Sequence, residues 1–154
     1  MPLAVGDKAP DFKMASDSGG EVSLAGLKGK SVILYFYPKD DTPGCTKEAC
    51  GFRDALSDFS GANAVIIGVS KDSVAKHDKF KAKYDLPFNL GADVDGAVCE
   101  DYGTWVEKSM YGRKYMGIER ATFLIDGDGV LRGVWRKVKV KGHVDAVLAA
   151  ARDL

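Results

Sequence analysis

The sequence predicts an α/β protein in which a central mixed β-sheet is flanked by helices. Two continuous apolar runs of β-forming residues, 31–38 and 63–70, are each followed by a segment with helical spacing. Strands that are buried on both faces read as continuous apolar runs, so both are expected at the centre of the sheet. A hairpin and a closing helix follow. This order of elements is typical of an α/β sandwich with a mixed sheet.

Turn residues and helical periodicity define the elements of the first half. The turn at 17–21 and the short strand that leads out of it predict an N-terminal β-hairpin extension. A helix is predicted over 42–59, because one stripe of this segment is apolar at helical spacing. That stripe consists of Cys45, Ala49, Phe52, Leu56 and Phe59.

The second half contains shorter elements. A helix over 73–85 is ended by Leu86-Pro87, and a short strand near Leu90 and a short helix over about 96–102 follow. Residues 121–140 predict a hairpin that turns at Gly127 and Gly129. Charged residues alternate with valine over 136–141, which predicts a solvated sheet face or a protected edge strand. The segment 143–154 is an amphipathic helix.

Composition indicates one globular domain, residues 1–154, with 45% apolar and 29% charged residues. The formal net charge is zero, which gives no reason to expect a nucleic-acid or membrane partner. The first residues lack the charged and apolar regions of a secretory signal. Three cysteines are few for a disulfide-stapled secreted protein, so a reducing, cytoplasmic location is expected.

The segment Thr42-Pro43-Gly44-Cys45 has the features of a helix start. Threonine is a favoured N-cap residue and proline is favoured at the first helical position, which places Cys45 third in the helix. The free N–H groups of such a turn carry partial positive charge and stabilise a thiolate. Cysteines in such positions have pKa values of roughly 3.5–7.5, compared with about 8.5 for an unperturbed thiol. Cys45 is therefore a candidate nucleophile.

Cys50 follows Cys45 at a spacing that a helix cannot bridge. Positions five apart on an ideal helix have Cα atoms roughly 8.7 Å apart, whereas a disulfide requires about 4.4–6.8 Å. Two helical thiols therefore stay free when reduced, and a bond between them requires local unwinding. Gly44 and Gly51 bracket the pair and lower the cost of that unwinding by up to about 1 kcal/mol each.

Two plainer interpretations of the cysteines are considered. A buried cysteine is usually a small hydrophobic residue, and Cys99 on the short helix is interpreted in this way. Two cysteines supply only two of the four ligands of a structural zinc site, and neither His77 nor His143 has finger-like spacing. His77 is interpreted as a surface residue of its helix and His143 as part of a helix start, with no role assigned to either.

The site residues resemble the active-site pattern of the peroxiredoxins. That pattern consists of Pro38, Thr42, Cys45 and a later Arg120. The segments 6–12 and 105–126, together with Cys50, are similar to the peroxiredoxin Q or bacterioferritin-comigratory-protein branch. The similarity runs from about Val5 to the last helix, and it implies a thioredoxin-like fold.

The resemblance implies a role for each matching residue. Cys45 would attack the peroxide and become a sulfenic acid, which Cys50 would resolve into an intramolecular disulfide. Thr42 would hydrogen-bond the sulfur or the peroxide, and Arg120 would stabilise the thiolate and the developing charge on the oxygens. Pro38 would shield the pocket from water. Glu48, one turn after Cys45, would hold Arg120 in place.

The resemblance also implies a thioredoxin-dependent peroxidase that acts on hydrogen peroxide and organic hydroperoxides. It requires no metal or organic cofactor, and a disulfide within one chain favours a monomer. A protein disulfide oxidoreductase lacks support because there is no Cys-x-x-Cys motif. A redox sensor or thiol-dependent chaperone that uses the same unwinding helix remains an alternative. Two interpretations are open for a group of apolar residues: they form an apolar rim of the peroxide site, or they pack in the ordinary way. These residues are Met110, Tyr111, Tyr115 and Met116.

Overall fold

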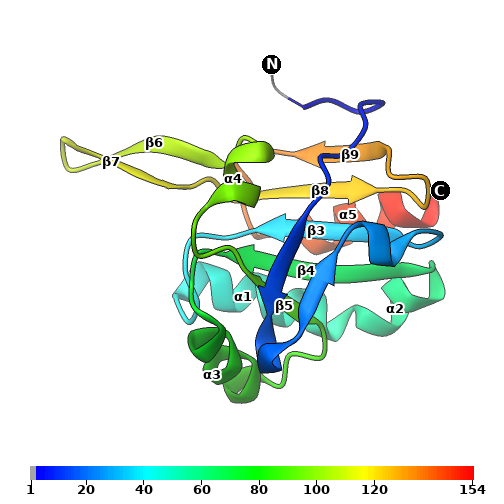
Figure 1. Cartoon of the computed structure of the whole chain (residues 1–154), viewed down its shortest axis with the longest axis horizontal. Coiled ribbons are helices and arrows are strands. Elements are labelled where there is room, and N and C mark those ends of the chain that lie inside the picture. The colour runs from blue at the N-terminus through cyan, green and yellow to red at the C-terminus, as the bar shows by residue number, and fades with distance from the viewer. Residues whose placement is uncertain (1–2) are drawn as a thin grey trace.

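The computed structural model describes residues 3–154, which form a seven-stranded mixed sheet with helices on both faces and a separate two-stranded ribbon (Figure 1). The strands are β1 (Lys13–Ser16), β2 (Glu21–Ser23), β3 (Ser31–Phe36), β4 (Ala64–Ser70), β5 (Asn89–Ala92), β6 (Trp105–Met110), β7 (Arg113–Ile118), β8 (Ala121–Ile125) and β9 (Leu131–Trp135). The α-helices are α1 (Pro43–Asp54), α2 (Leu56–Gly61), α3 (Val74–Tyr84), α4 (Ala97–Asp101) and α5 (His143–Arg152). Two short 3-10 helices are η1 (Asp17–Gly19) and η2 (Ala25–Leu27).

The main sheet has the order β2-β1-β5-β4-β3-β8-β9, which confirms the predicted fold class. β3 runs parallel to β4, and β4 runs parallel to β5, while β8 and β9 are antiparallel neighbours at one side. β1 and β2 pair as the expected N-terminal hairpin. Parallel strands end at the same edge of a sheet, so the loops after β3, β4 and β5 meet there. α1 begins at this edge.

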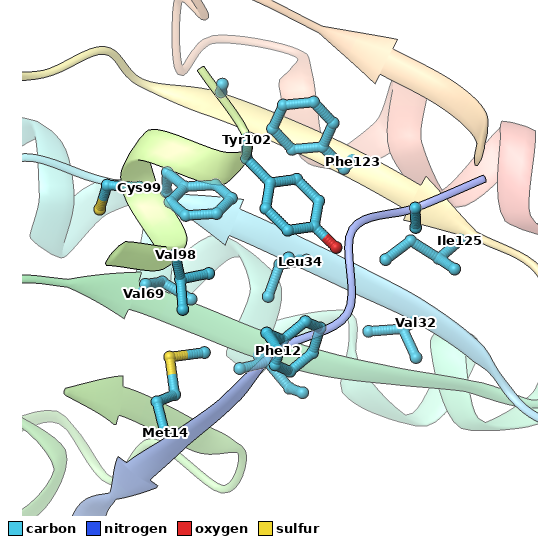
Figure 2. Close-up of a cluster of buried hydrophobic side chains, with 14 of the residues drawn as sticks. Phe12, Met14, Val32, Leu34, Val69, Val98, Cys99, Tyr102, Phe123 and Ile125 are labelled. Carbon is cyan, nitrogen blue, oxygen red and sulfur yellow. The ribbon is translucent and has the colours of Figure 1, made fainter. Parts of the chain in front are cut away.

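Alternate side chains of β3 supply the two faces of the core. Val32, Leu34 and Phe36 point into a cluster that the N-terminal segment and α4 cover. In Figure 2, Phe12 lies near Val32, and the ring of Tyr102 lies beside that of Phe123 from β8. Ile33 and Tyr35 point into a second cluster formed with α1, α2, α3 and α5. Because β3 is buried on both faces, its position relative to α1 is fixed.

Two of the predicted elements differ in the structure. The helix predicted over 42–59 is interrupted at Ala55, where the backbone lies at φ −97° and ψ 3°, and it continues as α2. Residues 136–141 form no strand within the described chain, because β9 ends at Trp135 and Lys137 has a positive φ of 48°. The alternation of charge and valine reflects an irregular connection to α5 rather than a pleated edge.

The ribbon β6–β7 was not predicted as a pair of strands. It projects from the body of the protein (Figure 1), so neither of its faces has the burial that produces a regular apolar pattern. Tyr111 at its tip is 98% exposed, and three further apolar side chains are exposed. These are Met110, Tyr115 and Met116. Of the two interpretations of these four residues, ordinary packing is therefore wrong, and an apolar rim of the peroxide site stays a prediction.

Candidate active site

The start of α1 places Cys45 at the third helical position, as predicted. Thr42 has the extended backbone of an N-cap residue, and its carbonyl accepts the first helical hydrogen bond from Thr46 N at 2.8 Å. Its side chain makes no capping bond within the described chain; instead its hydroxyl donates to Lys39 O at 2.9 Å. The N-cap position is thus correct, but capping by the side chain is not. The free N–H groups of the first turn remain available near Cys45.

Arg120 joins Cys45 and Glu48 through its guanidinium group. One nitrogen, Nη2, donates to Cys45 Sγ at 3.3 Å, and the other, Nη1, donates to Glu48 Oε1 at 2.7 Å. Cys45 is 1% exposed and Glu48 is fully buried. A forked guanidinium can hold two acceptors in fixed positions, which a single ammonium group cannot. The predicted placement of Glu48 against Arg120 is therefore present.

The register of the sheet brings Arg120 to this place. β8 pairs with β3 so that Ala121 lies opposite Phe36, the last residue of β3. The residue before Ala121 therefore lies beside the segment that leads from β3 to α1. A contact across 75 positions of sequence results from this pairing.

Burial dominates the electrostatics of the Glu48–Arg120 pair. It raises the pKa of Glu48 to about 7, although the charge and hydrogen bond of Arg120 act in the opposite direction. Burial also disfavours the charged form of Arg120, but Glu48 and Cys45 outweigh this effect and raise its pKa. Among the residues described, Glu48 Oε2 and Tyr35 Oη are buried without a hydrogen-bond partner. The guanidinium of Arg120 is thus bonded to two buried groups, the Cys45 sulfur and the Glu48 carboxyl.

Gly44 lets the guanidinium approach the helix. A Cβ atom at this position would lie 3.1 Å from Arg120 Nη2. Gly51 has the same relation to α5, because a Cβ atom there would lie 3.1 Å from Val144 Cγ2. Both glycines therefore have packing roles, in addition to the expected effect on unwinding.

Cys50 lies on the same continuous helix as Cys45, and all three cysteines are free. Cys50 is half-buried and lines an open groove of about 580 Å³ between α1 and the start of α5. Helical geometry separates the two Cα atoms by roughly 8.7 Å, so this conformation excludes a disulfide between them. A thiol that approaches from outside can reach the groove.

The other predicted residues lie as follows. Pro38 is exposed two residues after β3, so its shielding role stays a prediction. Cys99 is fully buried, as expected of a core residue, and burial followed by the hydrogen bond and charge of Asp93 raises the pKa of its thiol. No group of three or more potential metal ligands occurs within residues 3–154.

The interpretation of His77 as a surface residue is wrong. Its side chain is fully buried and contacts Asp40 and Gly91. A sequence signal existed, because His77 lies three positions before the buried Phe80 on the same stripe of α3. His143 does begin α5, but it too is buried, with Nε2 2.7 Å from Thr122 Oγ1. Burial, followed by the charge of Arg120, lowers the pKa of His143 to about 4.

These features define a thiol-dependent redox site: a buried cysteine in the first turn of a helix, a cation bonded to its sulfur, and a second thiol on the same helix. The AhpC/TSA family model matches residues 5–134. A bcp peroxiredoxin of Coxiella burnetii is 61% identical over 96% of this chain and 98% of its own. Peroxiredoxin Bcp of Bacillus subtilis is 52% identical over 100% of this chain and 98% of its own.

A solved structure of the Xanthomonas campestris bacterioferritin comigratory protein matches with a TM-score of 0.88 and 45% identity, covering 92% of this chain and 90% of that one. The chain belongs to the AhpC/TSA family and, within it, to the peroxiredoxin Q or Bcp subfamily, and it is accordingly a thioredoxin-fold peroxidase. Among residues 3–154, no helix has the length and apolar character needed to cross a membrane.

Proposed function

We propose that this peroxiredoxin reduces hydrogen peroxide and organic hydroperoxides through Cys45. The observation that carries the proposal is the hydrogen bond from Arg120 Nη2 to the buried Cys45 Sγ at 3.3 Å. A low-pKa thiol alone reacts slowly with peroxide, and most of the acceleration has to come from donors aimed at the breaking O–O bond. Arg120 supplies such a donor where the attacked oxygens would lie.

The first chemical step balances as follows. The Cys45 thiolate attacks the terminal peroxide oxygen, the S–O bond forms as the O–O bond breaks, and the other oxygen leaves with the bonding electron pair. That oxygen takes a proton and departs as water or an alcohol, and Cys45 becomes a sulfenic acid. Arg120 stabilises the negative charge that grows on the departing oxygen.

Thr42 has a defined part in this step. Its hydroxyl proton is donated to Lys39 O, which leaves the oxygen lone pairs free. Thr42 therefore accepts a hydrogen bond from the O–H of the peroxide and orients it toward the sulfur. Pro38 keeps water away from the same pocket.

Organic hydroperoxides are included as substrates on two grounds. The structures of the Xanthomonas campestris relative concern its alkyl peroxide reduction activity. In this chain, Lys108 and Tyr115 pair across the ribbon β6–β7. Burial and then the charge of Arg120 lower the pKa of Lys108, and this influence of Arg120 supports a position of this ribbon face near the site. Tyr115 offers an apolar surface there to an organic group.

The second step forms a disulfide between Cys45 and Cys50. The Cys50 thiolate attacks the sulfenic sulfur, water leaves, and the S–S bond forms within one chain. The first turns of α1 have to unwind for this step. Thioredoxin then reduces the bond through the groove beside Cys50, while its own dithiol becomes a disulfide.

The protein acts as a monomer of one domain, residues 1–154, in the cytoplasm.

The assignment of the two thiols is tested by intact mass after treatment with peroxide. The parent protein is expected to lose two hydrogen atoms, and Cys45→Ser is expected to show no specific oxidation. Cys50→Ser is expected to accumulate a sulfenic or over-oxidised species. Cys99→Ala serves as the matched control, because the buried Cys99 takes no part, and it should oxidise like the parent.

Turnover distinguishes a peroxidase from a sensor. With thioredoxin, its reductase and excess peroxide, the parent should complete many cycles, whereas a sensor would react once. Full peroxidase turnover by Cys45→Ser would show that the assignment of roles is wrong.

Unwinding of α1 gives a separate prediction. Amide hydrogen exchange should become faster over residues 43–50 when the disulfide forms, because helical hydrogen bonds in that segment open. Exchange in α5 should change little. Unchanged protection of 43–50 in the oxidised protein would contradict the proposed disulfide.

A further inference from the structure

The loop that leads from β3 to the Cys45 helix is fixed to α3 by buried polar contacts. Asp40, two residues before Thr42, has its carboxylate oxygen Oδ2 2.6 Å from His77 Nδ1. Its other oxygen, Oδ1, accepts from the Tyr37 hydroxyl, and its backbone N–H donates to Asp72 Oδ2 at 2.8 Å. The side chains of His77 and Asp40 are 0% and 6% exposed. The loop is therefore held from inside the protein.

The contact between His77 and Asp40 contains one proton in either of two arrangements. His77 Nε2 lies 2.9 Å from Gly91 O, a carbonyl that only accepts, so Nε2 carries a proton. At 2.6 Å, a bare Nδ1 and an ionised Asp40 carboxylate would repel each other. Either Nδ1 is protonated and Asp40 is ionised, or Asp40 is protonated and His77 is neutral. Both arrangements leave the buried pair without net charge.

The surroundings of His77 favour its protonated form. The titratable groups that act on His77 from neighbouring segments are Asp40, Asp72 and Tyr37. α3 itself also carries Lys76, Asp78, Lys79, Lys81, Lys83 and Tyr84, of which Lys81 pairs with Asp17. Burial disfavours the charged imidazole, but the hydrogen bond and charge of Asp40, with Gly91 O and Asp72, outweigh it and raise the pKa of His77.

We propose that His77 and Asp40 are positioning residues for Thr42 and the first turn of α1, and that they act through this one shared proton. Loss of one proton to solvent leaves a neutral imidazole that can donate to Asp40 or to Gly91 O but not to both, so one of the two contacts of His77 is lost and the loop is held less firmly against α3. The Thr42 hydroxyl and the start of the helix lose their alignment with Arg120. The inference rests on the proposed role of Cys45 as the peroxide-reactive thiol.

The sign of the pH dependence follows from the raised pKa of His77. The contribution of the His77–Asp40 pair to the alignment of the loop is complete below the ordinary histidine pKa of about 6.5. This contribution is lost as the pH rises through the raised pKa of His77. The rate of oxidation of Cys45 by peroxide, divided by the fraction of Cys45 that is thiolate, should therefore decrease toward alkaline pH.

The experiment compares two reactions of Cys45 at each pH: oxidation by hydrogen peroxide in a single turnover, and alkylation by iodoacetamide. Both require the thiolate, but only oxidation depends on aligned donors, so their rate ratio removes the titration of the thiol itself. Asp40→Asn is the critical variant. Its amide can donate to a neutral His77 Nδ1 and accept from Tyr37, so the contacts remain while the shared proton does not.

The parent ratio should decrease with rising pH, and the Asp40→Asn ratio should stay flat near the neutral parent value. Asp40→Ala, which lacks both contacts, should reduce the ratio at neutral pH by about tenfold or more, because misplaced groups lose rate steeply. Asp41→Asn is the matched control: its exposed carboxylate binds Lys83 and Tyr84 on the surface, and it should keep the parent profile.

Two results would overturn the inference. If the ratio of oxidation to alkylation decreases toward alkaline pH in Asp40→Asn as much as in the parent, the shared proton does not cause the pH dependence. If a folded Asp40→Ala protein has the same ratio of oxidation to alkylation as the parent at neutral pH, Asp40 does not position Thr42 and the first turn of α1. Failure of the proposed function is a different result, since Cys45→Ser would then keep peroxidase activity whatever the Asp40 variants do.

Discussion

Arg120→Met is expected to reduce kcat/KM for hydrogen peroxide by about 10²–10³-fold, the loss that follows when one donor to a developing oxyanion is removed. Two contacts disappear together, the 3.3 Å bond to Cys45 Sγ and the 2.7 Å bond to Glu48 Oε1. The thiolate then lacks its nearest cation, and Glu48 remains buried without a partner. Stopped-flow oxidation of the reduced protein measures the first of these effects without the reductant.

The matched control is Arg132→Met, which removes an exposed arginine of β9 whose Nη1 lies 3.6 Å from Asp126 Oδ2. Arg132 is exposed and makes none of the contacts of the Cys45 site, so this variant should keep the parent rate. Arg120→Lys should fall between the parent and Arg120→Met, because an ammonium group keeps the charge but not the fork. A rate for Arg120→Met equal to that of the Arg132→Met control would refute the role of Arg120.

Local sequence signals predicted the part of the site that lies within one stretch of the chain, the start of α1. Thr42 and Pro43 defined where α1 begins, and this placed Cys45 in the first turn and Glu48 one turn later. The apolar run 31–38 identified β3 because burial on both faces removes alternation. The position of Arg120 was different. It depends on Ala121 pairing with Phe36, and no local pattern contains that register.

The errors have physical causes of the same kind. A single stripe of apolar residues continues across Ala55, so periodicity did not detect the break between α1 and α2. The ribbon β6–β7 lies outside the main core and lacks the burial that periodicity reports. The sequence favours a surface position for His77 because polar side chains are usually exposed, whereas in the structure Asp40 supplies a hydrogen-bond partner for its ring in the interior. That partner lies 37 positions away.

Glu48→Gln is expected to change the pH dependence of stability more than any other substitution of the site. Burial raises the pKa of Glu48 from 4.5 to about 7, so between these values the folded state binds more protons than the unfolded state. The free energy of unfolding of the parent therefore decreases as the pH rises through this interval. The contribution of Glu48 to that decrease is at most about 3 kcal/mol.

Glutamine keeps an acceptor for Arg120 but cannot ionise. Its amide nitrogen replaces Oε2, which already lacks a partner among the described residues, so the constant cost of the substitution is similar at every pH. The informative quantity is the difference between the unfolding free energies of parent and variant, measured by denaturant titration in reductant at about pH 5 and about pH 8. This difference should shift in favour of Glu48→Gln by up to about 3 kcal/mol at the higher pH. Glu107→Gln, on the exposed ribbon, should show no such shift. If Glu48→Gln and Glu107→Gln behave alike, Glu48 is ionised throughout this range and its charge is fully balanced by Arg120.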